Sequence, residues 1–373
     1  MFLNTSFTPY FTTAAIRNGL LSAVVALGIF ADAPAAHAEP ERPASKCTAA
    51  LADDNGFIGF ALENDFFART SNSDEHYTNG IQFSYLTSPK ASVARPLDSL
   101  TRVPMFGIDK KSSCASHRYA VALGQELFTP DDTDTSALVV DDRPYAAWLH
   151  LTFALQSVWT HEDSGMALQD HWKLDVGIVG PSALGEQIQN DYHGLIGVAE
   201  SNGWDNQLKD EIGINLTFER SIRSPVFETP ALLGLETDFV PYGVVSLGNV
   251  QTHAGLGGIF RIGPDIPEDF GPPRIYPGIG GSDVFIPNDN FDWYLFAGVE
   301  GRAVAHNIFL DGNSFRDSHS VDKYPFVAEG RVGIVAVVAK TARISYTHIF
   351  RSKEFRQQPE PDQFGSLTLS FAL

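Results

Sequence analysis

The stretch AAWLHLTFALQSV, residues 146–158, alternates apolar side chains with small or polar ones. One face carries Leu149, Leu151, Phe153 and Leu155. The opposite face carries His150, Thr152, Ala154 and Gln156. A period of two is typical of a β-strand, because successive residues of a strand point to opposite sides of the sheet. The stretch therefore predicts a strand that separates an apolar environment from a polar one.

The same pattern returns from residue 57 to the last residue, in runs of about 10 residues divided by Gly, Pro, Asn and Asp. Twelve runs lie at 57–65, 78–88, 117–128, 146–160, 169–180, 208–222, 236–248, 253–263, 291–310, 324–338, 341–351 and 363–373. An even number of strands is typical of bacterial outer-membrane barrels. We therefore expect an all-β fold, a twelve-stranded antiparallel transmembrane β-barrel with a short helix in an extracellular loop.

The polar faces of these runs favour a barrel interior over the solvated face of a soluble sandwich. They are rich in Gly, Ala, Ser and Thr, and their occasional charges include Glu300, Arg302, Glu329 and Arg331. Small residues relieve crowding inside a narrow barrel, and charges there can pair. The last run, 363–373, is an amphipathic strand that resembles the assembly signal of outer-membrane barrels. We therefore expect the barrel assembly machinery as a partner.

The first residues predict export. An apolar run at 19–30 precedes an A-x-A site at 36–38, and this combination is typical of a secretory signal. We expect a signal peptide at 1–38, a periplasmic tail at 39–56, and a barrel at 57–373 that resides as a monomer in the bacterial outer membrane.

Charge and cysteine content limit the partners. The formal net charge is -19, from 45 acidic and 26 basic residues, which argues against nucleic acid because phosphate binding needs a basic surface. The balance is compatible with divalent cations, or with lipopolysaccharide whose anionic groups such cations bridge. Cys47 and Cys114 are the only cysteines, and two cysteines in an exported chain suit one disulfide.

Strand parity sorts the connections between the two ends of the barrel. With both termini periplasmic, the extracellular connections are 66–77, 129–145, 181–207, 249–252, 311–323 and 352–362. The periplasmic connections are 89–116, 161–168, 223–235, 264–290 and 339–340. Cys47 and Cys114 then lie on the same side. The pattern does not explain the length of the connection 264–290.

The connection 181–207 predicts a short helix on the outer rim. Pro181 and Ser182 suit a helix start, and the apolar side chains recur at helical spacing. They are Leu184, Ile188, Leu195 and Ile196. His193 would be offered from this helix, on the same side of the barrel as the polar first hairpin.

That first hairpin, ENDFFARTSNSDEHYTNG at 63–80, holds more polar side chains than a turn requires. Asn64 and Asp65 leave the first strand while Thr78 and Asn79 begin the second, so the pairs can meet across the hairpin. Carboxylate, amide and hydroxyl oxygens are ligands suited to calcium. A nearby neutral imidazole can take a proton from water.

Six motifs in order carry a family resemblance. They are ENDFF (63–67), YTNGI (77–81), DDRPYAAWLHL (141–151), VGIVGPSALGEQIQNDYHGLIG (176–197), GWDNQLKDE (203–211) and FLDGNSF (309–315). Together they resemble the outer-membrane lipid A deacylases, the lipid A 3'-O-deacylase family. The resemblance implies a twelve-stranded barrel, a carboxylic ester hydrolase that removes an acyloxyacyl group from lipid A. It also implies a calcium-dependent mechanism.

The resemblance also implies the site residues. They are Asn64, Asp65, Thr78, His193 and Glu200. Asp65 would hold calcium, His193 would activate water, Asn64 and Thr78 would position the carbonyl or the water of the metal, and Glu200 would orient the attack. The family glutamate falls on Ala199 when residues are counted without gaps, so Glu200 departs from the pattern by one position.

Each assignment has a structural alternative. Asn64 and Asp65 could cap local backbone groups as turn residues, His193 could be a surface histidine, and Thr78 could be an ordinary strand residue. The segment 141–148 could bind a metal, or a lipid phosphate through Arg143, although a structural loop-to-strand entry is the favoured interpretation.

Two other functions compete with deacylation. An outer-membrane phospholipase would use a serine, a histidine and an asparagine with calcium, but Ser84 and Ser157 have no histidine nearby in a recognisable motif. A porin or other non-enzymatic barrel is expected to have a wider polar lumen and usually more strands.

Overall fold

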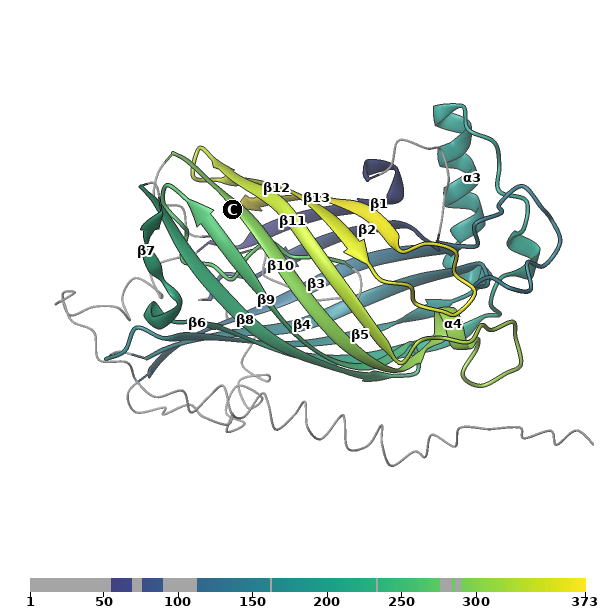
Figure 1. Cartoon of the computed structure of the whole chain (residues 1–373), viewed down its shortest axis with the longest axis horizontal. Helices are drawn as coiled ribbons and strands as arrows, with labels where there is room; N and C mark the ends of the chain where they lie inside the picture. Colours follow the sequence, from purple (N-terminus) through teal and green to yellow (C-terminus); the bar gives the residue numbers. More distant parts are fainter. Residues whose placement is uncertain are drawn as a thin grey trace, which may run out of the picture.

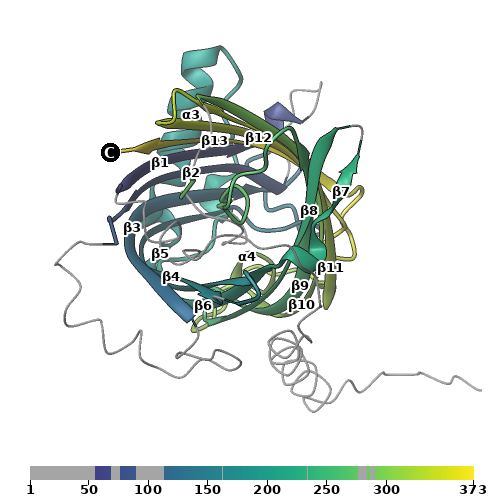
Figure 2. The ribbon, with the colours of Figure 1, turned by 90° about the vertical axis from the view of Figure 1, so that its left-hand side faces the viewer.

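The protein folds as a closed antiparallel barrel (Figures 1 and 2). A computed structural model describes residues 55–68, 76–89, 113–161, 163–232, 234–275, 284–285 and 290–373. The strands of the ring are β1 (Phe57–Asn64), β2 (His76–Leu86), β3 (Ser113–Thr129), β4 (Ala146–His161), β5 (Ala167–Val179), β6 (Glu211–Arg223), β8 (Leu235–Gly248), β9 (Gln251–Gly263), β10 (Phe291–Asn307), β11 (Phe326–Val338), β12 (Ala342–Arg351) and β13 (Asp362–Ala372). The twelve-stranded fold is confirmed.

The ring is completed by two pairings, and the first joins the two ends of the barrel sequence. β1 pairs with β13 along its whole length, from Phe57 opposite Ala372 to Asn64 opposite Gly365. β6 pairs with β8, skipping one strand of the chain order. That skipped strand, β7 (Thr229–Leu232), pairs with β8 alone in the described part of the sheet. The sequence pattern missed β7 because four residues are too few to show alternation.

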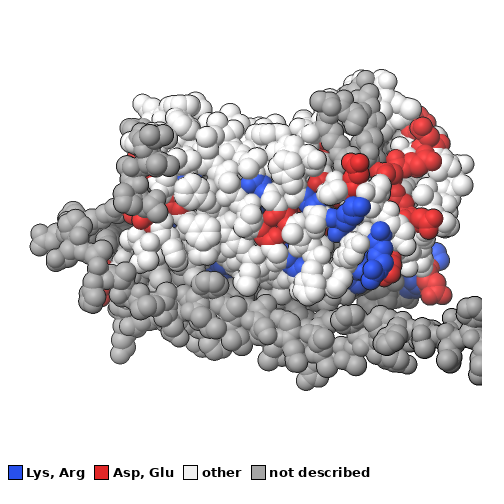
Figure 3. Space-filling model, in the orientation of Figure 1, with Lys and Arg blue, Asp and Glu red and all other residues white. Residues whose placement is uncertain are grey.

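The predicted faces of β4 are confirmed. Leu151 and Phe153 are 46% and 51% exposed, whereas Thr152 and Gln156 are buried and hydrogen-bonded to Asp175 and to Gln169 of β5 at 2.7 and 2.6 Å. Apolar side chains that face lipid require no hydrogen bonds. Polar side chains in the interior form hydrogen bonds with neighbouring strands. Most of the visible barrel wall is uncharged (Figure 3).

Short helices cluster at one end of the barrel. They are η2 (Asp65–Phe67), η5 (Pro181–Ala183), α3 (Gly185–Ile196), η6 (Trp204–Asn206) and α4 (Ile308–Asp311). The described end opposite to them carries η7 (Pro225–Phe227), β7 and the C-terminus (Figure 1). Within the described ranges, no helix is long and apolar enough to cross a membrane.

The lumen contains the charged side chains that the sequence pattern predicts. Arg302 pairs with Glu300 at 3.0 Å and with Glu329 at 3.3 Å. Arg331 donates to the hydroxyl of Tyr242 at 2.7 Å. Glu300, Arg302 and Glu329 therefore pair as predicted, because buried ions are tolerated only with partners.

The connection after β9 supplies a further lumen cation. Arg274 donates to Glu300 at 2.5 Å and to Glu329 at 2.7 Å, and the backbone N–H of Ile275 donates to Glu63 of β1 at 2.9 Å. The segment 264–275 therefore folds into the barrel and fills part of its interior. This packing explains why the connection is long.

The export signal and the disulfide stay predictions. The signal peptide, residues 1–38, and Cys47 lie outside the described residues. The backbone of Cys114 lies in β3. Helix α3 confirms the predicted rim helix, although Pro181 begins η5 and the α-helix starts only at Gly185. Strand β6 begins at Glu211 rather than at 208, and the short helix η6 ends before it at Asn206.

Candidate active site at the barrel rim

Asn64 and Thr78 lie next to each other across the first hairpin. Asn64 is opposite Asn79 in the β1–β2 register, and its Nδ2 donates to the carbonyl of Thr78 at 3.0 Å. Thr78 also contacts Thr129 of β3, hydroxyl to hydroxyl, at 2.7 Å. The hairpin therefore brings these two predicted residues together, as antiparallel pairing requires.

Asp65 begins the 3-10 helix η2 and is 2% exposed. The backbone N–H of Phe66 donates to Oδ1 of both Asn64 and Asp65, at 2.9 and 2.8 Å. Asn64 therefore caps η2, so the turn role considered for this pair is real. In the described residues no other histidine, cysteine or acid joins Asp65 in a group of three that could hold a metal. A calcium ion at Asp65 would need amide, carbonyl, water or substrate oxygens, which suit calcium.

His193 lies on α3 with one nitrogen already committed. Its side chain is 5% exposed, and Nδ1 lies 2.6 Å from the carbonyl oxygen of Ala199. A carbonyl can only accept, so Nδ1 carries a hydrogen, and in the neutral imidazole Nε2 then carries the lone pair. This tautomer is the one that a general base acting through Nε2 requires.

Contacts fasten α3 to the barrel wall. Nε1 of Trp204 donates to Gln189 of α3 at 2.8 Å, and the Trp204 ring packs with Leu127 of β3 and with Tyr145. Gln125 of β3 donates to the carbonyl of Ala183 at 2.6 Å. The strand under α3 is therefore β3, which also carries Thr129, the residue that contacts Thr78.

The same end of the barrel thus carries the hairpin pair and the histidine. Helix α3 and the short helix η2 (purple) both lie at that end of the barrel (Figure 1). Glu200 follows the segment that turns back from α3, and its side chain is exposed. The carbonyl of Ala199 orients the imidazole of His193 through Nδ1.

Comparison with known proteins identifies the family. Residues 21–373 match the family described as outer membrane protein LpxR. The chain belongs to the LpxR family. This LpxR-family protein is therefore an outer-membrane barrel, and the family resemblance and localisation predicted above are confirmed.

A solved structure of the family shares the fold. LpxR from Salmonella typhimurium is 19% identical, with a TM-score of 0.64 over 84% of this chain and 99% of that chain. The β domain of the Bordetella autotransporter BrkA is 8% identical, with a TM-score of 0.44 over 86% of this chain and 100% of that chain. No curated protein sequence matches.

Arg143 serves structure in this LpxR-family barrel. Its guanidinium is buried and donates to Glu354 at 2.8 Å, and it lies over the rings of Phe128 and Phe355. A buried, paired guanidinium stacked on aromatic rings ties the segment before β4 to the β12–β13 connection. The structural interpretation of the segment 141–148 therefore fits these contacts.

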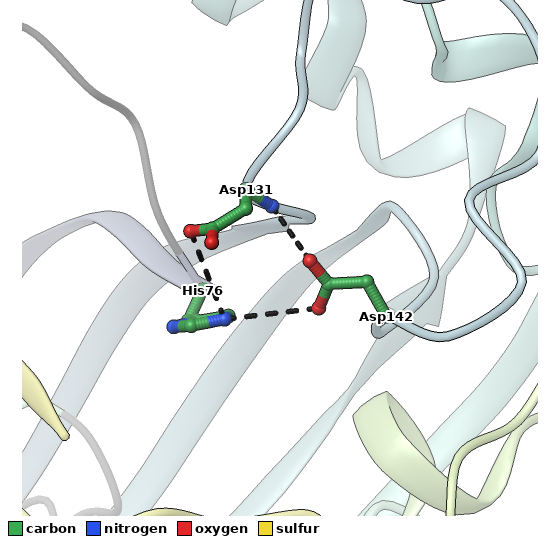
Figure 4. A group of neighbouring side chains, drawn as sticks. All are labelled: His76, Asp131 and Asp142. Carbon is green, nitrogen blue, oxygen red and sulfur yellow. Dashed lines mark hydrogen bonds and ion pairs between the residues drawn. The ribbon is translucent and has the colours of Figure 1, made fainter. Parts of the chain in front are cut away.

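Two side-chain groups escaped the sequence analysis. His76, Asp131 and Asp142 converge at the rim (Figure 4), and such a group can hold a metal ion. His117 lies 2.8 Å from Ser157, Nδ1 to Oγ, so Ser157 does have a histidine neighbour, contrary to the expectation from sequence. Both groups join separate strands or connections, and only the strand register could have shown them in advance.

Proposed function

We propose that the protein is a lipid A deacylase that hydrolyses the 3'-acyloxyacyl ester of lipopolysaccharide in the outer leaflet. Membership of the LpxR family supports this activity. The observation that carries the mechanism is the buried imidazole of His193, held through Nδ1 at the barrel end that also presents Asn64, Asp65 and Thr78.

His193 acts as the general base. Its Nε2 takes a proton from water, and the water oxygen bonds to the ester carbonyl carbon. The bond to the sugar oxygen then breaks, and the proton held on His193 passes to that oxygen, which leaves as the sugar hydroxyl. The hydrogen bond from Nδ1 to Ala199 keeps the ring in the correct tautomer and orientation during both proton transfers.

The hairpin residues position the ester. Asn64 uses one amide hydrogen on the Thr78 carbonyl, and its second amide hydrogen remains a donor by chemistry. A calcium ion held at Asp65 would supply electrostatic stabilisation of the oxyanion. Glu200, whose side chain is exposed, would orient the water or the substrate.

A phospholipase built on a serine nucleophile is less well supported. His117 and Ser157 make the required contact, but Ser157 lies close to His161, where β4 ends opposite to the α3 rim. A pore for diffusion is disfavoured because the segment 264–275 occupies the lumen through Arg274.

Mass spectrometry of lipid A from cells expressing the protein tests the proposal. We expect the lipid A of cells that express the wild type to lose one acyloxyacyl unit. We expect His193→Ala to lower the rate of deacylation by about 10² to 10⁴ fold, the usual contribution of a general base. His306→Ala is the matched control, because His306 is a rim histidine that contacts the Asn249 carbonyl outside the proposed site. Unchanged deacylation in a folded His193→Ala barrel contradicts the mechanism. Release of lysophospholipid by the wild type, abolished in Ser157→Ala, supports the phospholipase instead.

A further inference from the structure

A histidine and two aspartates meet at the rim, outside the residues assigned to deacylation. Nε2 of His76 lies 3.7 Å from Oδ1 of Asp142 and 4.0 Å from Oδ1 of Asp131, and one donor atom from each residue lies within 4.8 Å of the others (Figure 4). We propose that these three side chains form a structural site for a zinc-type divalent cation.

The strand register explains why the three residues meet. His76, the first residue of β2, is opposite Thr129 of β3, and Asp131 follows Thr129 by two positions. The connection then folds back, so that the backbone N–H of Asp131 donates to Oδ2 of Asp142 at 2.8 Å. The backbone N–H of Arg143 donates to Oδ1 of Asp142 at 2.6 Å. Asp142 is therefore held in place by the backbone.

The imidazole of His76 is buried and aimed at the two carboxylates. It is 1% exposed, and its Nδ1 lies 2.5 Å from Oδ1 of Asp362, which also accepts from Gln358 at 2.9 Å. Because an ionised carboxylate only accepts, Nδ1 carries a hydrogen. Nε2 has no hydrogen-bond partner among the described residues. A buried nitrogen that faces carboxylates without a hydrogen bond is costly unless a cation lies between them.

The distances favour a metal ion over a proton. A proton on Nε2 would draw a carboxylate to about 2.7–2.9 Å, the range of charge-assisted hydrogen bonds, whereas the nearest of these carboxylate oxygens lies at 3.7 Å. Tetrahedral zinc with bonds of about 2.0–2.2 Å separates its ligand atoms by roughly 3.4 Å. The observed spacing is therefore close to that of a ligand set. The contact from Asp362 to Nδ1 matches the outer carboxylate that orients a metal-binding histidine.

The donor set selects the class of cation. Calcium and magnesium prefer oxygen ligands alone, while an imidazole with two carboxylates suits zinc and its neighbours in the transition series. Among the described residues, no lysine or arginine forms an ion pair with Asp142, so the cation would also balance a buried charge. The side chain of Asp131 is 36% exposed. The ion can therefore enter from solvent, and a water molecule can act as the fourth ligand.

A metal at this position would brace the rim that supports α3. The site joins β2 to the β3–β4 connection and, through Asp362, to β13. The same connection accepts hydrogen bonds from the segment after α3, at Thr133 from Asn202 at 2.9 Å and at Ser136 from Asn206 at 3.0 Å. The inference concerns stability and metal content, so it stands independently of the deacylase proposal.

Metal titration of the full-length protein in detergent micelles tests the site. After removal of metal with a chelator, we expect the wild type to bind one equivalent of Zn²⁺ by calorimetry, and Co²⁺ to give the strong visible absorption of a tetrahedral complex. Asp142→Asn keeps the size of the side chain and removes its charge, and we expect it to weaken binding by at least about 100-fold. Asp362→Asn is expected to weaken binding by about 10–100 fold, as for other outer partners of metal-bound histidines.

Asp311→Asn is the matched control. Asp311 is also an aspartate beside a rim histidine, at 3.2 Å from His306, but Lys323 already balances its charge at 2.8 Å. Its variant should bind Zn²⁺ like the wild type. Folding is checked for every variant by the heat-dependent gel mobility of the barrel. A wild type that binds no Zn²⁺, or a folded Asp142→Asn variant that binds as tightly as the wild type, overturns the proposal.

Discussion

Replacing Arg274 with Met measures how strongly the segment 264–275 is fixed inside the barrel. The guanidinium donates to Glu300 at 2.5 Å and to Glu329 at 2.7 Å. Burial lowers the pKa of Arg274, but nearby groups, Glu300 foremost, outweigh it and raise the pKa well above its usual value. Arg274 therefore stays charged, and its removal leaves buried carboxylates with fewer partners.

The size of the effect follows from the remaining contacts. Breaking a buried ion pair by removing one partner costs about 3–5 kcal/mol. Arg302 still contacts both glutamates, and Arg351 still contacts Glu329 at 3.0 Å. We therefore expect Arg274→Met to lower the free energy of unfolding by about 3 kcal/mol, at the lower end of that range.

Urea unfolding in lipid vesicles, followed by tryptophan fluorescence, provides the measurement. Arg356→Met is the matched control, because Arg356 pairs with Asp322 at 2.8 Å while the two side chains are 59% and 67% exposed. An exposed pair of this kind contributes no more than about 1 kcal/mol. A double-mutant cycle of Arg274→Met with Glu300→Gln should give a coupling of about 1–3 kcal/mol. Equal effects of the two arginine variants, with zero coupling, would refute the reasoning.

Three further predictions concern single groups. Burial raises the pKa of Asp311, but hydrogen bonds from His306 and Lys323 outweigh it and hold the pKa below its usual value. The contribution of the ionised Asp311 to stability should be present above about pH 4 and disappear as the pH falls through the folded pKa. Unfolding curves of Asp311→Asn and wild type should therefore converge in acid. Glu200→Gln should lower the deacylation rate by less than about 10-fold, well short of a general base, because the Glu200 side chain is exposed; a loss as large as that of His193→Ala in the same lipid A assay would place the carboxylate in the proton transfer. Gly177→Ala should reduce the yield of folded barrel on a heat-dependent gel, because an added Cβ would meet the Leu149 carbonyl and the His150 backbone, which cannot move aside; a wild-type yield would contradict this.

The strand pattern in the sequence predicted most of the fold. Alternation over about 10 residues is a local property, and the twelve runs predicted from it correspond to the twelve strands of the ring. Hairpin pairing of neighbouring strands is nearly local as well, so the contact of Asn64 with Thr78 was accessible from sequence. The position of His193 on a helix followed from helical spacing and was confirmed by α3.

Other parts of the molecule could not be predicted because they depend on distant residues. Arg274 finds its partners on β10 and β11 only when the barrel is closed. The carbonyl that sets the tautomer of His193 belongs to Ala199, one residue before the expected glutamate. Backbone carbonyls carry no sequence signal, since every residue has one.

The amino-acid sequence by itself determined the barrel, its strand number, the rim helix and the family, because side-chain alternation and short motifs are written along the chain. Only the tertiary structure decided which polar groups share an environment. His76, Asp131, Asp142 and Asp362 span most of the barrel sequence, yet strand register and ring closure bring them to one point. The physical reason is that barrel closure removes water from these groups, so each buried charge must find its partner across the ring rather than along the chain.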